Sequence, residues 1–259
     1  MITFQGLPSF DLENGLLCAW WFEPLLATMS FAFWVNFYWH HERIRGLSND
    51  KRFIPDGHYY GAWWYQSVSA YWIGIYILKL FAPTPSSQIP NRIPHSVSDL
   101  AYVLVELVAG VVAYDTIIFF VHWALHDVPV LRKFHRTHHH QHDGNLESRD
   151  TLNHSLVDGS LQVIVNILVQ RTTPWGSVKT RLARALHNIF VTWMLVESHT
   201  SSPYPNIWRR FFVGVRNHRM HHIGGKHCHQ QFFGYLDNLR DACFACADET
   251  KIQFKAKQL

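Results

Sequence analysis

The sequence predicts an all-α membrane protein with about four transmembrane or re-entrant helices. Hydrophobic residues make up 48% of the 259 residues and charged residues only 16%, which is below the share of about 25% in ordinary soluble domains. Several apolar stretches also have the length that a membrane helix needs. The mean hydropathy of -0.07 indicates that a sizeable polar part lies outside the bilayer.

Apolar stretches in the first half of the chain predict three membrane helices. The first runs from Leu16 to Trp39, and Pro24 either kinks it or marks its start. The second, Gly61 to Phe81, begins with Trp and Tyr residues that are typical of a membrane interface. The third, Leu100 to Ala124, leads directly into a histidine-rich part of the chain.

Two later apolar stretches, Leu156 to Val169 and Ala183 to Val196, are shorter than a full span and predict buried or re-entrant helices. No Gly/Ser/Pro-rich linker or charge block divides the chain, so we expect residues 1–259 to form a single unit. Within it we distinguish an N-terminal membrane hairpin (1–99), a histidine-rich region (100–245) and a polar tail (246–259).

Basic residues between the first two spans predict the orientation in the membrane. Four Lys or Arg residues lie within residues 40–57, whereas the loop after the second span contains only Arg92. Because basic loops tend to remain in the cytosol, we expect residues 40–57 there. The third span returns the chain to the same side, so His122 and the residues after it are predicted to face the cytosol.

Charge and cysteine usage exclude several other classes. The net charge is +4, but the basic residues are scattered, so nucleic acid is not an expected partner. Four cysteines are too few for a disulfide scaffold and fit reduced thiols. Cys243 and Cys246 have zinc-like spacing, but no second pair matches them. The N-terminus carries acidic and no basic residues before the first apolar stretch, so a cleaved signal peptide is not expected.

Histidine is the most unusual residue of this sequence, because 15 of its 19 histidines lie between His122 and His229. His122 and His126 share one face of the helix that continues the third span. Two later motifs each have the spacing i, i+3, i+4. Neutral imidazole binds Fe, Cu and Zn, and the number of nitrogens exceeds the needs of one ion, so two ions are predicted. We therefore expect a helical dimetal domain on the cytosolic face, with ligands from His122, His126, His135, His138, His139, His218, His221 and His222.

The order of these motifs, HxxxH and then HxxHH twice, resembles the fatty acid hydroxylase/sterol desaturase superfamily, and the resemblance covers about residues 115–239. The segment from His154 to Gly159 resembles the superfamily's H-P-x-D/E-G element, with Ser155 in place of Pro. Glu197-Ser-His199 resembles its (E/D)-x-H element. The resemblance thus adds His154 and His199 to the expected ligands. Near the C-terminus, the Asn and Trp of the superfamily pattern are missing, which concerns the subfamily and not the metal site.

Three carboxylates are candidates for orienting the ligands: Asp115, Asp158 and Glu197. Asp115 lies seven residues before His122 and can either accept its second imidazole N–H or serve only in helix packing. Asp158 can orient His154 from four residues away. Glu197 is expected to have an orienting or structural role.

The resemblance implies an enzyme in which two iron ions and O₂ hydroxylate an unactivated C–H bond of a lipid, sterol or terpenoid-like substrate. A desaturase on the same scaffold is the nearest alternative, followed by an aldehyde-forming or carbon–carbon-cleaving relative. A non-enzymatic membrane metal carrier is the alternative from a different class. In a carrier, the histidines would line a path across the membrane.

The chain contains no dinucleotide-binding fingerprint and no haem-binding element, so an external electron donor is expected. By resemblance this donor is cytochrome b5 with its NAD(P)H-dependent reductase, docked near the basic residues. The tail from Lys255 to Leu259 resembles a K-x-K-x-x retrieval signal, which predicts a multi-pass protein of the endoplasmic reticulum.

The remaining histidines are expected to be less important. His187 lies in an apolar stretch and is predicted to be a packed residue. Four others lie near the motifs but outside their spacing, and their roles stay open: His140, His142, His227 and His229.

Overall fold

The computed structural model describes residues 21–47, 60–81, 93–139, 146–200, 212, 214–224 and 228–243. Within these ranges the fold is helical and no β-strand forms. Several predicted features lie outside the described residues: the N-terminal part of the first span, most of the basic loop, His140, His142, His227 and the tail from residue 246.

The apolar stretches of the sequence are helices. The first forms α1 (Phe22–Ile44), and Pro24 lies in its first turn, where a missing N–H leaves no hydrogen bond unmade. The second and third form α2 (Tyr60–Phe81) and α3 (Val97–Asp127). The two shorter stretches form α5 (Leu156–Arg171) and α6 (Arg181–Glu197).

One described helix, α3, is long and apolar enough to cross a membrane. It has 31 residues and a mean hydropathy of 2.1 over its most apolar part. The predicted number of four membrane helices and the cytosolic orientation stay predictions.

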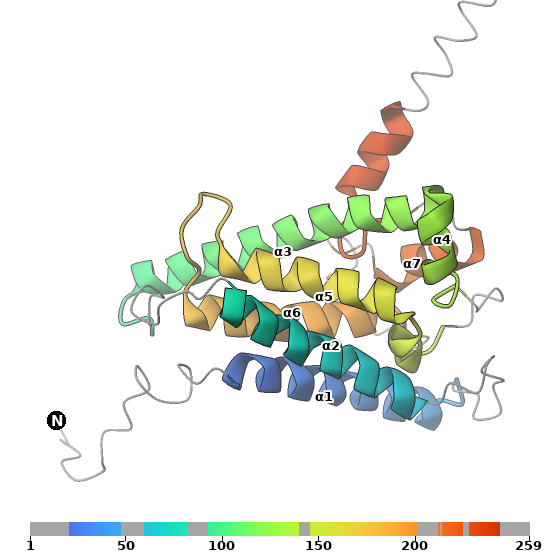
Figure 1. Ribbon diagram of the computed structural model, residues 1–259, viewed down its shortest axis with the longest axis horizontal. Coiled ribbons are helices and arrows are strands. Elements are labelled where there is room, and N and C mark those ends of the chain that lie inside the picture. The colour runs from blue at the N-terminus through green and yellow to red at the C-terminus, as the bar shows by residue number, and fades with distance from the viewer. Residues whose placement is uncertain are drawn as a thin grey trace, which may run out of the picture.

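The five long helices lie side by side along the long axis of the molecule (Figure 1). Helix α1 packs against α6, α2 packs against α5, and α3 contacts both α5 and α6. Three short helices lie toward one end: α4 (Pro129–His135), the 3-10 helix η4 (Ser148–Leu152) and α7 (Gly214–Gly224). The last turns of α3 and the first turn of α5 also lie at this end of the bundle.

Polar side chains fix where the central helices begin. Ser155 Oγ accepts a hydrogen bond from the Asp158 N–H at the start of α5, and Thr180 Oγ1 accepts one from the Ala183 N–H at the start of α6. Thr180 also donates its hydroxyl proton to Glu106 on α3 over 2.6 Å. The beginning of α6 is thereby attached to the N-terminal third of α3.

Asp115 on α3 is fully buried, and it attaches residues 230–233 to the bundle. Its carboxylate accepts hydrogen bonds from the N–H groups of Gln231, Phe232 and Phe233 over 2.7 to 3.1 Å, and from Gln230 Nε2 over 2.6 Å. Asp115 therefore binds the backbone of residues 231–233, and it has no hydrogen bond to His122.

We predict that Asp115→Ala lowers the free energy of unfolding by about 3 kcal/mol or more, because four buried donors lose a charged acceptor together. Thermal unfolding of the purified protein measures this effect. Asp127→Ala, which removes an exposed carboxylate from the same helix, is the matched control and should leave the midpoint within about 1 °C of the wild type. Equal midpoints for the two variants would contradict the anchoring role.

Candidate metal centre

Four segments that carry histidines meet at the end of the bundle where α4 and α7 lie (Figure 1). The C-terminal end of α3, α4 with the turn after it, the residues after α6, and α7 all contribute side chains. Nine of the ten predicted ligands form two groups, and within each group one nitrogen per residue lies within 4.8 Å of all the others.

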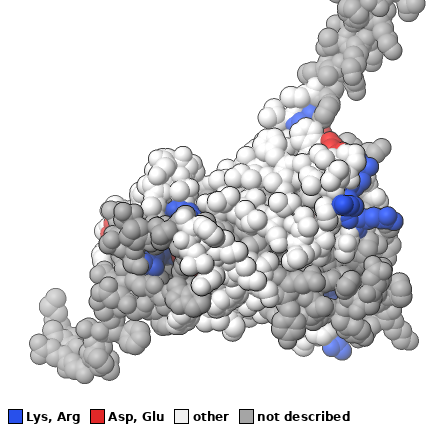
Figure 2. All heavy atoms as spheres, in the orientation of Figure 1, with Lys and Arg blue, Asp and Glu red and all other residues white. Residues whose placement is uncertain are grey.

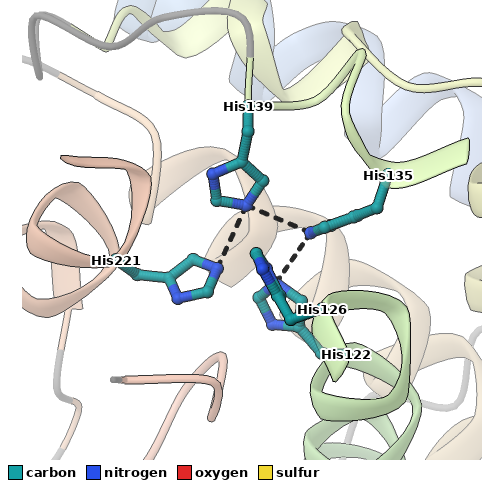
Figure 3. A group of neighbouring side chains, drawn as sticks. All are labelled: His122, His126, His135, His139 and His221. Carbon is teal, nitrogen blue, oxygen red and sulfur yellow. Dashed lines mark hydrogen bonds between the residues drawn. The ribbon is translucent and has the colours of Figure 1, made fainter. Parts of the chain in front are cut away.

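The first group combines the HxxxH motif with three residues of the two HxxHH motifs: His122, His126, His135, His139 and His221. Figure 3 shows these five imidazoles pointing toward one another. The Nε2 atoms of His122 and His135 are 3.0 Å apart, and those of His139 and His135 are 3.1 Å apart. The separation of His221 Nε2 from His139 Nε2 is also 3.1 Å.

The second group contains the remaining residues of the HxxHH motifs together with a histidine that follows α6. Its members are His138, His199, His218 and His222. His199 Nε2 lies 3.0 Å from His218 Nε2 and 3.4 Å from His138 Nε2. His222 Nε2 lies 3.1 Å from His218 Nε2. Two nitrogens bound at right angles to one ion, each at about 2.1 Å, are themselves about 3 Å apart. The observed spacing is therefore that of ligands around an ion.

Oxygen acceptors outside the groups orient two rings of the first group. The Nδ1–H of His135 donates to Asp158 Oδ2 over 2.8 Å, and the Nδ1–H of His122 donates to the backbone oxygen of His229 over 2.8 Å. A neutral imidazole that donates from Nδ1 presents a lone pair at Nε2. Both rings therefore present lone pairs to the centre of the group.

The same orientation occurs in the second group. The Nδ1–H of His138 donates to the oxygen of Asn153 over 3.0 Å, and the Nδ1–H of His199 donates to the oxygen of Leu195 over 2.8 Å. Neutral rings in these tautomers place two Nε2 lone pairs opposite each other, at 3.0 Å for His122 and His135 and at 3.4 Å for His138 and His199. No proton lies between such atoms, and their repulsion disappears when a cation binds both. The donor set thus fits a metal ion in each group.

Burial keeps these rings from becoming positively charged instead. It lowers the pKa of His138 well below 6.5, and the neighbouring His199 and His135 lower it further. Burial also lowers the pKa of His199 to about 4. In α7, burial lowers the pKa of His218 and His222 well below 6.5, and the neighbouring histidines add a smaller effect in the same direction. At neutral pH these four imidazoles are therefore neutral bases that can bind a metal, as ligating imidazoles must be.

His154, the tenth predicted ligand, lies outside both groups. It is buried, with 8% of its surface exposed, and its Nδ1 contacts the Ser155 oxygen at 3.3 Å. Its ring packs on Gly159, where an added Cβ would lie 2.4 Å from His154 Cε1. Only glycine at position 159 leaves room for the ring there.

The three predicted carboxylates have different positions. Asp158 contacts His135, whereas the sequence suggested His154 as its partner. Burial raises the pKa of the Asp158 carboxyl, but the hydrogen bond from His135 and the interactions with neighbouring histidines outweigh burial, so the pKa falls below its usual value. Glu197 is buried at the C-terminal end of α6, two residues before His199. Asp115 binds the backbone of residues 231–233 and no predicted ligand.

The sequence motifs did not single out His229, which the structure buries against the first group. Its ring centroid lies 5.1 to 5.7 Å from those of His122, His126 and His221. Arg240 donates to His229 Nδ1, so the proton of the neutral ring is on Nε2 and no lone pair faces the group. Because His229 lies in an irregular segment, no helical spacing could have found it.

A cavity of about 850 Å³, including its open mouth, adjoins the second group. His138, His154 and His199 line one part of its wall, and α1, α2, α5 and α6 supply most of the rest. A smaller cavity of about 300 Å³ reaches His122, His135 and His218. Gln162 and Gln231 line both cavities, so two amide side chains lie where the centre meets the larger space, a position that the sequence did not reveal.

Comparison with protein families gave a match to the Fatty acid hydroxylase family over residues 107–243. Comparisons with curated proteins and with solved structures gave no match. The matched residues include every histidine of the two groups and the segment that Asp115 anchors. Since the match covers more than half of a chain whose three histidine motifs meet at one end of a helical bundle, the chain belongs to the fatty acid hydroxylase family.

Proposed function

We propose that this protein is a membrane-bound di-iron oxidoreductase that hydroxylates an unactivated C–H bond of a lipid, sterol or terpenoid-like substrate with O₂. Family membership implies an oxidoreductase of the hydroxylase or desaturase type and association with a membrane. The observation that carries the proposal is the pairs of Nε2 lone pairs that face each other in both histidine groups.

The residues of this chain have three tasks in the proposed reaction. The two groups would hold one ion each, with His122, His135, His138 and His199 fixed by their Nδ1–H donors. The apolar wall of the large cavity would keep water away and bring a C–H bond to the second group. Bound iron supplies the redox chemistry that activates O₂.

Two alternatives make different demands on the site. A desaturase would use the same ligands and differ only in how the substrate is placed. A metal carrier would need histidines along a path through the bundle, but the nine grouped histidines gather at one end of it. This arrangement favours an enzyme.

An external donor would supply two electrons for each turnover. Figure 2 shows Lys and Arg side chains at the end of the molecule where α4 lies, and Arg132, Lys133 and Arg136 are exposed there. They adjoin His135 in the sequence, so a donor bound on them would be close to the first group. An acidic protein such as cytochrome b5 with its NAD(P)H-dependent reductase fits this charge. Together with the positive-inside pattern, this charge supports a site on the cytosolic face of the membrane.

Iron content tests the two-group arrangement. We expect about two iron ions per wild-type chain, and about one in His138→Ala or His221→Ala, because each variant removes a ligand from a different group. Elemental analysis of the purified proteins measures this ratio. His95→Ala removes an exposed histidine and should retain both ions. Full iron in both variants would refute the ligand assignment, and exchangeable zinc without O₂ uptake would refute the enzyme.

The mass of the product distinguishes hydroxylation from desaturation. Iron-loaded protein, NADH, a reducing system and a lipid extract are incubated under labelled O₂, and products are compared by mass spectrometry. Hydroxylation adds one labelled oxygen atom, whereas desaturation removes two hydrogen atoms and leaves no label. We expect the labelled oxygen, and it should be absent with His138→Ala.

Charge reversal tests the electron-donor surface. Lys133→Glu combined with Arg136→Glu should slow donor-driven turnover roughly tenfold at low salt, because opposite charges speed the encounter. The exchange Lys133→Arg with Arg136→Lys preserves the charge and serves as the control. Turnover driven by dithionite should be the same in all three proteins. Equal salt dependence of wild type and the reversed variant would contradict docking at this surface.

A further inference from the structure

Two groups of hydrogen-bonded polar side chains lie in the wall of the large cavity. One is the histidine end, where Gly159 on α5 contacts His154 and the Leu195 oxygen on α6 accepts a hydrogen bond from His199. Asn166 lies seven residues after Gly159, and seven residues of α-helix extend about 10 Å. Asn188 lies seven residues before Leu195, which gives the same distance of about 10 Å along α6. The second polar place is therefore about 10 Å from the histidines.

Side chains from α2, α5 and α6 form this second place. Tyr71 and Asn166 line the cavity, and Asn188 is fully buried. The Asn188 Oδ1 atom accepts hydrogen bonds from the Tyr71 hydroxyl over 3.0 Å and from Asn166 Nδ2 over 3.3 Å, and Gln170 Nε2 donates to it as well. The Asn166 Oδ1 atom accepts a hydrogen bond from His187 Nε2 over 3.1 Å. Both cavity-lining side chains are thereby fixed in orientation.

These fixed side chains retain capacity for one more partner. A phenol oxygen that donates its proton still has lone pairs, and an amide nitrogen that donates one proton has a second. Gln170 also hydrogen-bonds to the Tyr71 oxygen, which leaves that oxygen one lone pair to accept a hydrogen bond from a hydroxyl group. Asn166 Nδ2 can donate one to a hydroxyl or carbonyl oxygen. Between this place and the histidines the wall contains Val163 and Val191. It also contains Gln162, which donates to Asp158, and Thr192, which donates to the Asn188 backbone oxygen.

The charge of the wall limits which head group can be buried here. Among the described residues that line the cavity, none is Lys, Arg, Asp or Glu. The charged neighbours of Tyr71, Glu23 and Arg184, form an ion pair of 2.6 Å with each other. A carboxylate or phosphate at this place would be buried without a counter-ion, which is costly. A neutral group avoids this cost.

We propose that the cavity binds an elongated lipid with a neutral polar end, a hydroxyl or carbonyl group, which contacts Tyr71 and Asn166 while a carbon about 10 Å away faces the histidines. The identity of the reaction at that carbon rests on the proposed function; the recognition of the polar end does not. The substrate class is therefore lipid alcohols and ketones, and fatty acids in their ionised form are excluded.

Equilibrium binding to the zinc-loaded protein in detergent tests this proposal without turnover. Labelled hexadecanol is the probe, with hexadecane and palmitate as competitors at pH 8 and protein-free micelles as the blank. We expect the alcohol to bind roughly 3- to 10-fold more tightly than the hydrocarbon, as one or two hydrogen bonds allow. Tyr71→Phe should abolish most of this ratio, and palmitate should compete less well than the alcohol.

Tyr76→Phe on the same helix is the matched control, because the Tyr76 side chain is exposed, and it should keep the wild-type ratio. The ratio is measured within each variant, so a smaller folded fraction does not change it. Absence of alcohol binding, an unchanged ratio in Tyr71→Phe, or tighter binding of palmitate would overturn the proposal. Loss of iron or of O₂ uptake in the separate metal experiment would overturn the proposed function and leave this ratio intact.

Discussion

The repulsion between unprotonated imidazole nitrogens is the constraint on which this structure depends. Nine histidines share the end of one helical bundle, and four of them donate Nδ1–H to oxygen atoms outside the groups. This orientation leaves each of the four rings with an Nε2 lone pair that can bind a metal and that repels the lone pair of a facing ring. The surrounding helices therefore place Nε2 atoms about 3 Å apart, which is the spacing of ligands around one cation.

Elements far from the centre contribute to this orientation through backbone. Among the described residues Asp115 has no hydrogen bond to an imidazole, but it holds residues 231–233. These begin two residues after His229, whose carbonyl accepts from His122. Asp237 adds to the same effect by accepting from the N–H groups of His229 and Gln230. A carboxylate in the middle of α3 thus contributes to the tautomer of a histidine two turns away, by way of a segment more than 100 residues later.

The sequence was sufficient to predict the helices and most of the centre, for a simple physical reason. Apolar runs such as Leu100 to Ala124 identify helices, and the spacing i, i+3, i+4 places imidazoles on one side of a turn whatever the tertiary fold. It was not sufficient where partners come from irregular segments. His229 and Gln231 have no helical register, and the oxygen acceptors of His122, His138 and His199 are backbone atoms that any residue supplies. The partner of Asp158 depends on tertiary contact with His135, so local spacing pointed to His154 instead.

Glu42, near the C-terminal end of α1, is fully buried and accepts hydrogen bonds from Ser148 and Thr200 over 2.7 to 3.2 Å. Ser148 begins the 3-10 helix that precedes His154, and Thr200 directly follows His199. The first helix thus supports the end of the bundle where the histidines meet. A fragment limited to the family-matched residues 107–243 would therefore lack this support and the parts of the cavity wall that α1 and α2 supply.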